Sequence, residues 1–514
     1  MSKPIPKPET CPELVFGLVG PIGVNIDAVQ ECLISSLKQV NYTSKVVHIS
    51  KLVEAQQSKK LKPKKGQTKL EMKISQANAF CSVAEDGSAL AGLAILEILK
   101  LRKSANIKQG LPEAEHESAR QHDAYIIRQL KRQAEVELLR TVYGEKFVQI
   151  SISLDKPSRV RRLTDRISRD HPNMALNDCE NHARRLVEID EDERSQSIGA
   201  TKAFGQEVGE IFHKGDFFIN TAEQSKVPEK VSRFVHAFFG DNSVSPTKDE
   251  FGTYMAAAAA LRSADLSRQV GSAIFSSTGD VLALGCNEVP RAGGGNYWYE
   301  DLDKYRDIEV GAEQNSIEKQ RIITDFLDRL KSAGLIDSSV DFDDQGHKDR
   351  LSEAIDEALI SDITEYGRMT HAEMSAICDA ARLGRPIGGS TIYVTTFPCH
   401  NCAKHIVAAG IKKVIYIEPY PKSRAERSHP DSISMDTPDL NKVVFEHFEG
   451  ISPRRYQSIF QKGRRRKGSE VQKWYGGEER PRISELDYLH TEREKPYAAL
   501  SLQKIRKKGA SPTS

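Results

Sequence analysis

The chain opens with a short apolar run that ends in glycine and continues into apolar positions at helical spacing. The run is LVFGLVG at residues 14–20, and Val29, Leu33 and Leu37 then recur every four residues. A continuous apolar run is typical of a buried strand, and recurrence at i and i+4 is typical of one face of a helix. Strand, turn and helix in this order predict the start of an α/β domain.

Four further apolar runs are expected to complete the sheet of this first domain. They lie at residues 45–50, 123–130, 146–153 and 215–220, and a basic helix is expected at 157–170. Each run has the length of an ordinary strand. We therefore expect a first α/β domain over residues 10–230.

A second set of elements follows an alanine-rich segment at residues 249–269, which is expected to be helical because alanine has the highest helix propensity. Two β-like runs then flank a Gly-Asp turn at Gly279. Beyond a long charged insertion, the pattern predicts a helix from His371, a strand, a helix from Cys399 and a last strand.

These elements predict a second domain over residues 250–465, with the charged insertion at about 297–365 and a helix within it at 317–334. The remaining residues, 466–514, are polar and basic and include GRRRKG, so we expect a peripheral C-terminal extension.

The composition narrows the class of protein. Of 514 residues, 39% are hydrophobic and 28% are charged, which is typical of a soluble globular protein. There is no apolar run of the roughly 18 residues that span a bilayer, and the first residues lack the apolar core of a signal peptide. We therefore expect a cytoplasmic protein without membrane contact. The net charge of +2 gives no global attraction to nucleic acid.

Two of the eight cysteines, Cys399 and Cys402, form a Pro-Cys-x-x-Cys motif, and the others lie at irregular distances that do not indicate a disulfide framework. Upstream lies His371-Ala-Glu373. His-x-Glu followed by Pro-Cys-x-x-Cys is the signature of the zinc nucleobase deaminases. A catalytic zinc needs three protein ligands and an open position, and His371, Cys399 and Cys402 would supply the three. Glu373 would be the proton shuttle.

Two other interpretations of the cysteine pair remain open. A redox pair would need a thioredoxin-like strand, turn and helix, and it has no use for a distant His-x-Glu. A structural zinc would need a fourth ligand, and the remaining cysteines offer no second close pair.

Three segments of the second domain resemble the deoxycytidylate (dCMP) deaminases: SRQVGSAIF, GCNEVP and HAEMSAI. The resemblance implies a cytidine deaminase-like α/β/α domain with a mixed sheet. It also implies that Asn287 contacts the sugar and that Arg268 holds phosphate at the mouth of the site. Ser375 stands where that family commonly has asparagine, so it is a further candidate for substrate contact.

The chain as a whole resembles the bacterial anti-phage dCTP deaminases, in which a P-loop-kinase-like domain precedes the deaminase domain. This resemblance implies conversion of dCTP to dUTP and of dCMP to dUMP, depletion of the dCTP pool during phage infection, a homo-oligomer, and control by a small inhibitory RNA. Cations after the last motif are candidates for binding a triphosphate: Lys422, Arg424, His429, Arg454 and Arg455. Alternative functions are a polynucleotide cytosine deaminase and an RNA-binding regulator.

The turn after the first strand, GPIGVNID, is a degenerate version of the phosphate-binding P-loop. Gly20 and Gly23 suit a turn, but Asn25 replaces the second required glycine. Ile26 stands where the lysine belongs, and Asp27 stands where the magnesium-binding hydroxyl belongs. Gly20, Gly23 and Asn25 are therefore candidates for nucleotide binding through backbone N–H groups, without kinase chemistry.

Overall fold

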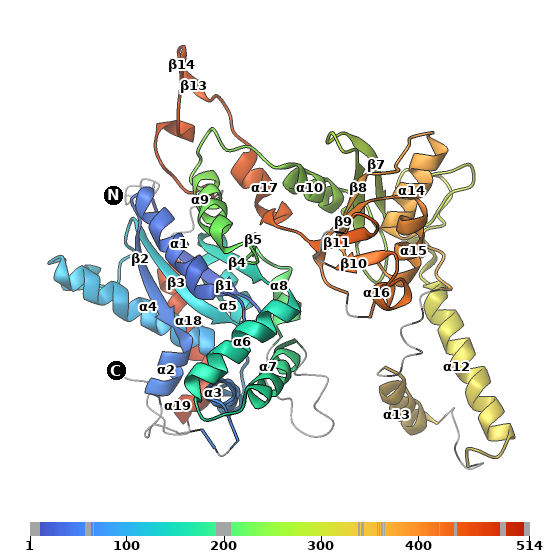
Figure 1. Ribbon diagram of the computed structural model, residues 1–514, viewed down its shortest axis with the longest axis horizontal. Helices are drawn as coiled ribbons and strands as arrows, with labels where there is room; N and C mark the ends of the chain where they lie inside the picture. Colours follow the sequence, from blue (N-terminus) through green and yellow to red (C-terminus); the bar gives the residue numbers. More distant parts are fainter. Residues whose placement is uncertain are drawn as a thin grey trace, which may run out of the picture. The chain divides into compact units, whose positions relative to one another are not determined.

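The computed structural model describes residues 11–56, 63–64, 66–191, 207–337, 340, 344–356, 358, 360, 363, 365–420, 422–435, 439–483 and 490–507. The chain divides into two compact units (Figure 1). Unit 1 consists of residues 1–250 together with 449–514, and unit 2 consists of residues 251–448. Unit 2 is thus an insertion within the sequence of unit 1.

The sheet of unit 1 has six strands in the order β12-β5-β4-β1-β3-β2. Strands β1 to β5 are parallel, and β12 at the edge runs antiparallel to β5. The strands are β1 (Leu14–Val19), β2 (Thr43–His48), β3 (Asp123–Leu130), β4 (Phe147–Ser153), β5 (Phe217–Asn220) and β12 (Gly450–Ile451). All five strands expected from the apolar runs are present.

One face of this sheet is covered by α1 (Ile26–Gln39) and α9 (Val227–Phe238). Side chains of a strand alternate between its faces, and Leu14, Phe16 and Leu18 share one buried cluster with α1 and α9. Val29, Leu33 and Leu37 of α1 are buried in that cluster, as their spacing predicts. The helices of unit 1 not yet given are α2 (Ile49–Ala55), α3 (Lys69–Ala84), α4 (Ala89–Lys108), α5 (Gln133–Tyr143), α6 (Lys156–Asp170), α7 (Leu176–Glu191), α8 (Val208–Phe212), α17 (Pro453–Phe460), α18 (His490–Ser501) and α19 (Gln503–Lys507).

A buried ionic network joins the start of β1 to α4 and α18. The Arg102 guanidinium donates to Glu13 at 2.8 Å and to Glu494 at 2.6 and 2.7 Å. Tyr143 donates to Glu494 at 2.8 Å, and His490 Nε2 lies 3.3 Å from Glu13. Burial alone would raise the pKa of Glu13, but His490 and Arg102 lower it to about 2. Glu13 is therefore ionised at neutral pH, opposite a permanently charged arginine.

The C-terminal segment differs from the peripheral extension expected at residues 466–514. The hairpin of β13 (Arg466–Lys467) and β14 (Glu470–Val471) is exposed, but α18 packs against α4 and α5 inside unit 1. Two of its polar residues are internal because Glu494 pairs with Arg102 and His490 lies against Glu13. The second domain, expected to reach residue 465, ends as a compact unit at Phe448, because β12 pairs with β5 of unit 1.

The sheet of unit 2 is mixed, with the order β10-β11-β9-β8-β6-β7. The hairpin of β6 and β7 is antiparallel, β8 pairs antiparallel with β6, and β8, β9, β11 and β10 are parallel. The strands are β6 (Gly271–Phe275), β7 (Val281–Cys286), β8 (Thr391–Thr396), β9 (Lys413–Glu418), β10 (Ile433–Met435) and β11 (Val443–His447).

Helices cover both faces of the sheet of unit 2, as an α/β/α domain requires. On one side α10 (Lys248–Ala260) approaches the sheet at Gly271, where a Cβ would lie 2.0 Å from the Ala256 carbonyl oxygen. On the other side α14 (Ala372–Arg382) and α15 (His400–Ala408) share a buried cluster with Ile274 and Ile392. The alanine-rich helix is confirmed but ends at Ala260, nine residues earlier than expected.

The charged insertion contains α11 (Asp307–Val310), α12 (Gln314–Ser332) and α13 (Gln345–Asp356). The helix expected at 317–334 is therefore confirmed as α12. A last short helix, α16 (Ala425–Ser428), follows β9. Among the described residues no single helix is long and apolar enough to cross a membrane, and α3 and α4, which pass that test only as a pair, meet at 94°.

Replacing Arg102 by methionine is expected to lower the free energy of unfolding of unit 1 by about 3–5 kcal/mol, because two buried carboxylates lose their counter-charge. Trp474 is buried in unit 1 and Trp298 is the other tryptophan of the chain. Urea unfolding followed by Trp474 fluorescence in a Trp298→Phe background therefore reports on unit 1.

The matched control is Lys495→Ala, on the same helix α18, which removes an exposed ion pair with Glu117. Its effect on the unfolding midpoint is expected to be small. Equal effects of the two substitutions would show that the buried network does not anchor α18.

Candidate metal centre and active site

His371 is the residue directly before α14, and the β6–β7 hairpin fixes its position. Its backbone is extended, with φ −60° and ψ 153°. At the next residue, Ala372 N donates to Asn287 Oδ1 at 2.9 Å, and Ser272 Oγ donates to the Ala372 carbonyl oxygen at 2.7 Å. Both polar groups of the first helical peptide are therefore held by the hairpin, and the imidazole is held with them.

A glycine lets α14 lie this close to the hairpin. A Cβ at Gly285 of β7 would lie 2.1 Å from the Ala372 carbonyl oxygen and 2.6 Å from Ala376 N. Both contacts are with helix backbone, which a rotamer change cannot relieve. Gly285 is thus required by close packing at the element that carries the first ligand.

The two cysteines lie at the start of α15. Cys399 is the N-cap residue of this helix, and its sulfur accepts a hydrogen bond from Cys402 N at 3.5 Å. The preceding loop is held by Ser423, whose hydroxyl donates to the Pro398 carbonyl oxygen at 2.8 Å. Residues three apart in the first turn share one helix face, so both sulfurs point to the same place.

His371, Cys399 and Cys402 come together as the predicted ligand group. Their ligand atoms all lie within 4.8 Å of one another, and His371 Nδ1 is 3.4 Å from each sulfur. Two ligands of a tetrahedral zinc, at about 2.1 and 2.3 Å from the ion, lie about 3.6 Å apart. One nitrogen equidistant from two sulfurs fits a shared metal ion better than a single hydrogen bond. The group therefore fits zinc with a fourth position left for another ligand.

The predicted proton shuttle is buried beside these ligands. Glu373 is 4% exposed and interacts with both Cys399 and Cys402. Burial raises the pKa of the Glu373 carboxyl, and the negative charge of Cys399 raises it further. Hydrogen bonds from Cys402 and His371 lower the pKa of the Cys399 thiol to about 4, so that sulfur is a thiolate at neutral pH.

Asn287 and Arg268 lie where the β6–β7 hairpin meets the preceding loop. The side-chain nitrogen of Asn287 donates to Asp265 at 3.1 Å and to the Arg268 carbonyl oxygen at 3.3 Å. Asn287 thus links this loop to the start of α14. The guanidinium of Arg268 is half exposed and lies 3.3 Å from Glu418, so an incoming phosphate would compete with a carboxylate.

Sequence reasoning missed two residues at this site. Asp265 accepts from Asn287 and also from Ser267 N at 2.7 Å, and its charge acts on His371. The signal was an Asp two residues before a Ser-Arg in the loop after α10, which is typical of an Asx turn. Asn296 donates to Ser375 Oγ at 3.1 Å, with both side chains buried. The predicted substrate contact Ser375 is therefore bonded to another loop of the protein.

The predicted triphosphate cations are divided between the two units. Lys422 and Arg424 are exposed in unit 2, and His429 follows α16 there. Arg454 and Arg455 belong to unit 1, and the surroundings of Arg455 do not fit the expectation. It is 5% exposed, pairs with the buried Asp216 at 3.1 Å and donates to two carbonyl oxygens near the start of β4. Arg455 therefore neutralises an internal carboxylate.

The degenerate loop joins β1 to α1 in unit 1. Gly23 has φ +95°, and a Cβ there would lie 2.8 Å from the Arg159 carbonyl oxygen. At Gly20 a Cβ would lie 2.9 Å from the Ile152 carbonyl oxygen. Asn25 is the N-cap of α1 and accepts from Ala28 N at 3.3 Å. The three candidate residues thus have structural roles in the turn, and their role in nucleotide binding stays a prediction.

Residues 246–418 match the family model described as the cytidine and deoxycytidylate deaminase zinc-binding region. This span includes His371, Glu373, Cys399 and Cys402. The chain therefore contains a zinc-binding region of the cytidine and dCMP deaminase type within a longer protein. The match confirms the predicted zinc and the deaminase-like fold of the C-terminal half.

The deoxycytidylate deaminase of enterobacteria phage T4 is 54% identical over 54 residues, which are 10% of this chain and 28% of the relative. ComE operon protein 2 of Bacillus subtilis is 41% identical over 75 residues, 15% of this chain and 36% of the relative. The human deoxycytidylate deaminase is 43% identical over 54 residues, 10% of this chain and 29% of the relative. The chain spans about a third of the length of these curated relatives.

Among solved structures, the dCMP deaminase of cyanophage S-TIM5 is similar over 40% of this chain and 99% of its own. The sequence identity is 17% and the TM-score is 0.21, so this likeness carries no argument here.

Alanine at His371, Cys399 or Cys402 is expected to reduce the zinc content of the purified protein from about one ion per chain to near zero. Metal analysis after gel filtration measures this. The matched control is Cys378→Ala, because this exposed cysteine lies on α14 itself and outside the ligand group. Full zinc content in a Cys402→Ala protein would contradict the three-ligand site.

Gly285→Ala is expected to weaken zinc retention and to lower the stability of unit 2, because the added methyl group displaces the start of α14 and His371 with it. Zinc release against a competing chelator measures the first effect. The neighbouring Leu284→Ala, at a partly exposed position of the same strand, is the control. Unchanged chelator sensitivity in Gly285→Ala would mean that α14 tolerates the shift without moving its ligand.

Proposed function

We propose that this protein is a zinc-dependent deaminase of deoxycytidine nucleotides, converting dCMP to dUMP and dCTP to dUTP. The observation that carries the proposal is the buried group of His371, Cys399 and Cys402 with Glu373 beside it, inside a region that matches the cytidine and deoxycytidylate deaminase family model. Relatives over this region are named deoxycytidylate deaminases, which supports a mononucleotide as substrate.

Zinc, when bound, lowers the pKa of a coordinated water to about 7 and so supplies the nucleophile at neutral pH. His371, Cys399 and Cys402 would hold this zinc. Glu373 would take a proton from the nucleophile and would return protons to N3 of the cytosine ring and to the departing amine. In the overall reaction water would add its oxygen to C4, the C4–N bond would break, and ammonia would leave with a uracil nucleotide as product. The raised pKa of Glu373 suits this work, because a carboxyl group that ionises nearer neutral pH can both accept and return a proton.

The main alternative keeps the chemistry and changes the substrate to a polynucleotide. Its support would be the basic stretches, of which Arg466 and Lys467 lie exposed on β13 in unit 1, whereas the zinc ligands lie in unit 2. The other stretch is KKLKPKKGQTK at residues 59–69, of which residues 59–62 and 65 lie outside the described residues. The similarity to deoxycytidylate deaminases favours the mononucleotide.

We further propose that deamination depletes the dCTP pool as a defence against phage. The support is the resemblance of the whole chain to the anti-phage dCTP deaminases, in which a kinase-like domain precedes the deaminase domain. A homo-oligomer and a small inhibitory RNA, both implied by the same resemblance, stay predictions.

The test is product analysis on zinc-loaded protein offered dCMP, dCTP, CTP, deoxycytidine and a cytosine-containing single strand in parallel. We expect dUMP and dUTP as the main products. Glu373→Gln keeps the size of the side chain and is expected to retain zinc while the rate falls by about 10²–10⁴-fold.

Turnover of the single strand alone would assign the chemistry to a polynucleotide. Absence of any turnover from protein that holds its zinc would contradict deamination. Loss of zinc in Glu373→Gln would make this residue part of the metal site, contrary to its assignment as a proton shuttle.

A further inference from the structure

Unit 1 contains a cavity of about 800 Å³ at the carboxyl ends of its parallel strands. It is lined by the loop after β1, by the ends of β2 and β3, and by α2, α3 and α6, which gather at one end of the sheet (Figure 1). Ligands of open α/β sheets bind at this edge. Gln129, at the end of β3, lines the cavity with a φ of +61°, which is a strained conformation for a residue other than glycine.

The wall of this cavity is strongly basic. Its lining contains eight lysines and arginines and four aspartates and glutamates. Three of those carboxylates are already paired with cations: Asp27 with Arg128 at 2.6 Å, Glu54 with Lys73 at 3.1 Å, and Asp170 with Lys69 at 3.7 Å. Two more of the cations pair with buried carboxylates: Lys131 with Asp190 at 2.7 Å and Arg132 with Glu135 at 3.0 Å. Lys51, Arg162, Arg166 and Arg169 are the lining cations left without an ion pair to a described residue.

The cations least engaged lie on α6 and α2. Arg162 donates from Nε to the Gly23 carbonyl oxygen at 3.1 Å, which leaves its two terminal nitrogens. Arg166 and Lys51 make no hydrogen bond or ion pair to any residue that the structure describes, and both are exposed at the cavity. Two arginine forks and an ammonium group on facing elements suit the oxygens of a phosphate chain.

The degenerate loop itself is not the main anion site, because an internal carboxylate is already bound to it. The fully buried Asp190 of α7 accepts from Ile22 N at 2.6 Å and pairs with Lys131 at 2.7 Å. Lys131 also donates to the Gly20 carbonyl oxygen at 2.8 Å. With Asp190 on the loop, the arginines of α6 are the groups left for a ligand phosphate.

Part of the cavity lining is apolar. Helices α2, α3 and α4 contribute Ile49, Val53, Leu70, Ile74 and Leu90. An inorganic anion makes no favourable contact with apolar side chains. A volume of this size and a lining of apolar side chains with a few convergent charges are typical of small-molecule sites.

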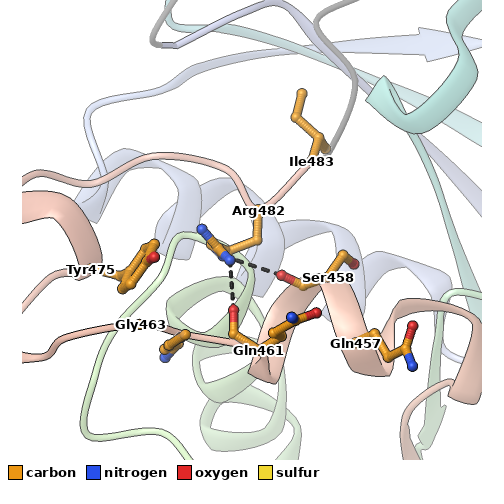
Figure 2. A pocket seen from close by; sticks show the side chains of 8 residues that line it. Gln457, Ser458, Gln461, Gly463, Tyr475, Arg482 and Ile483 are labelled. Atoms are coloured by element: carbon orange, nitrogen blue, oxygen red, sulfur yellow. Dashed lines mark hydrogen bonds between the residues drawn. The ribbon is translucent and has the colours of Figure 1, made fainter.

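In a second cavity of unit 1, of about 540 Å³, the arginine is bonded to the protein itself (Figure 2). There Arg482 donates to the carbonyl oxygens of Ser458, at 3.1 Å, and Gln461, at 2.8 Å. Its guanidinium also lies 4.4 Å from the ring centre of Tyr475. This cation is used to hold the chain together, so the hollow around it offers little to a ligand.

We propose that the larger cavity binds a nucleotide-class ligand, with its phosphates on Arg162, Arg166 and Lys51 and its base against the apolar side chains of α2, α3 and α4. This site is separate from the zinc centre and binds its ligand without transferring a phosphoryl group. The ligand of this site does not have to contain cytosine.

The test is calorimetric titration of the full-length protein with ATP, GTP and dTTP, and with inorganic tripolyphosphate as the probe for phosphate alone. We expect at least one nucleotide to bind with a Kd below about 1 mM, and tripolyphosphate to bind at least about tenfold more weakly. Arg166→Glu is expected to weaken nucleotide binding at least about tenfold. Arg161→Glu, the matched control, reverses an exposed charge on the same helix outside the cavity and is expected to leave binding unchanged.

Each of several results would overturn the proposal. The first is that no nucleotide binds. The second is that tripolyphosphate binds as tightly as the nucleotides, which would mean that the apolar side chains have no role. The third is that Arg161→Glu weakens binding as much as Arg166→Glu, which would indicate nonspecific attraction. The fourth is that a short RNA displaces the nucleotide at lower concentration and that its binding depends on Arg166, which would assign the cavity to a polymer. Because the probes contain no cytosine, none of these results bears on deamination.

Discussion

The metal centre depends on the close packing of α14 against the β6–β7 hairpin. Gly285 permits the backbone contact, and Ser272 and Asn287 hold the first peptide of the helix from the two strands. These contacts fix the position of His371, whereas the start of α15 fixes the positions of the two cysteines. The ligand group is therefore assembled by packing of the polypeptide, which agrees with the general need for a supporting shell around metal ligands.

Unit 1 handles charge in a different way. Four of its internal carboxylates are matched by cations from distant parts of the sequence: Glu13 and Glu494 by Arg102, Asp190 by Lys131, and Asp216 by Arg455. Burial alone would raise the pKa of Asp216, yet Arg455 and Arg140 hold it below its ordinary value. Arg166 and Lys51 at the larger cavity are an exception, because neither pairs with a residue that the structure describes.

Much of the fold and the centre of the candidate site could be predicted from the sequence. The strands of unit 1 are apolar runs of ordinary length, and the zinc ligands are adjacent within short motifs whose spacing reflects one helix turn. The contacts that escaped prediction are long-range. The sequence of helix α18 is polar because the face that it buries is charged. Its burial is explained by Arg102, which is far away in the sequence. Arg455 looks like a surface cation until Asp216 is seen beside it, and Asn296 meets Ser375 across a loop whose path no local pattern reveals.

The insertion of unit 2 within the sequence of unit 1 has a consequence for biosynthesis. Strand β12 and helix α18, which complete the sheet edge and the ionic network of unit 1, are translated after every residue of unit 2. Until they leave the ribosome, Arg102 lacks Glu494, Glu13 lacks His490, and the edge of β5 lacks its partner. Domains generally fold as units during synthesis. Here the deaminase-like unit can fold first, and a prematurely terminated chain can carry a finished metal centre on an unfinished unit 1.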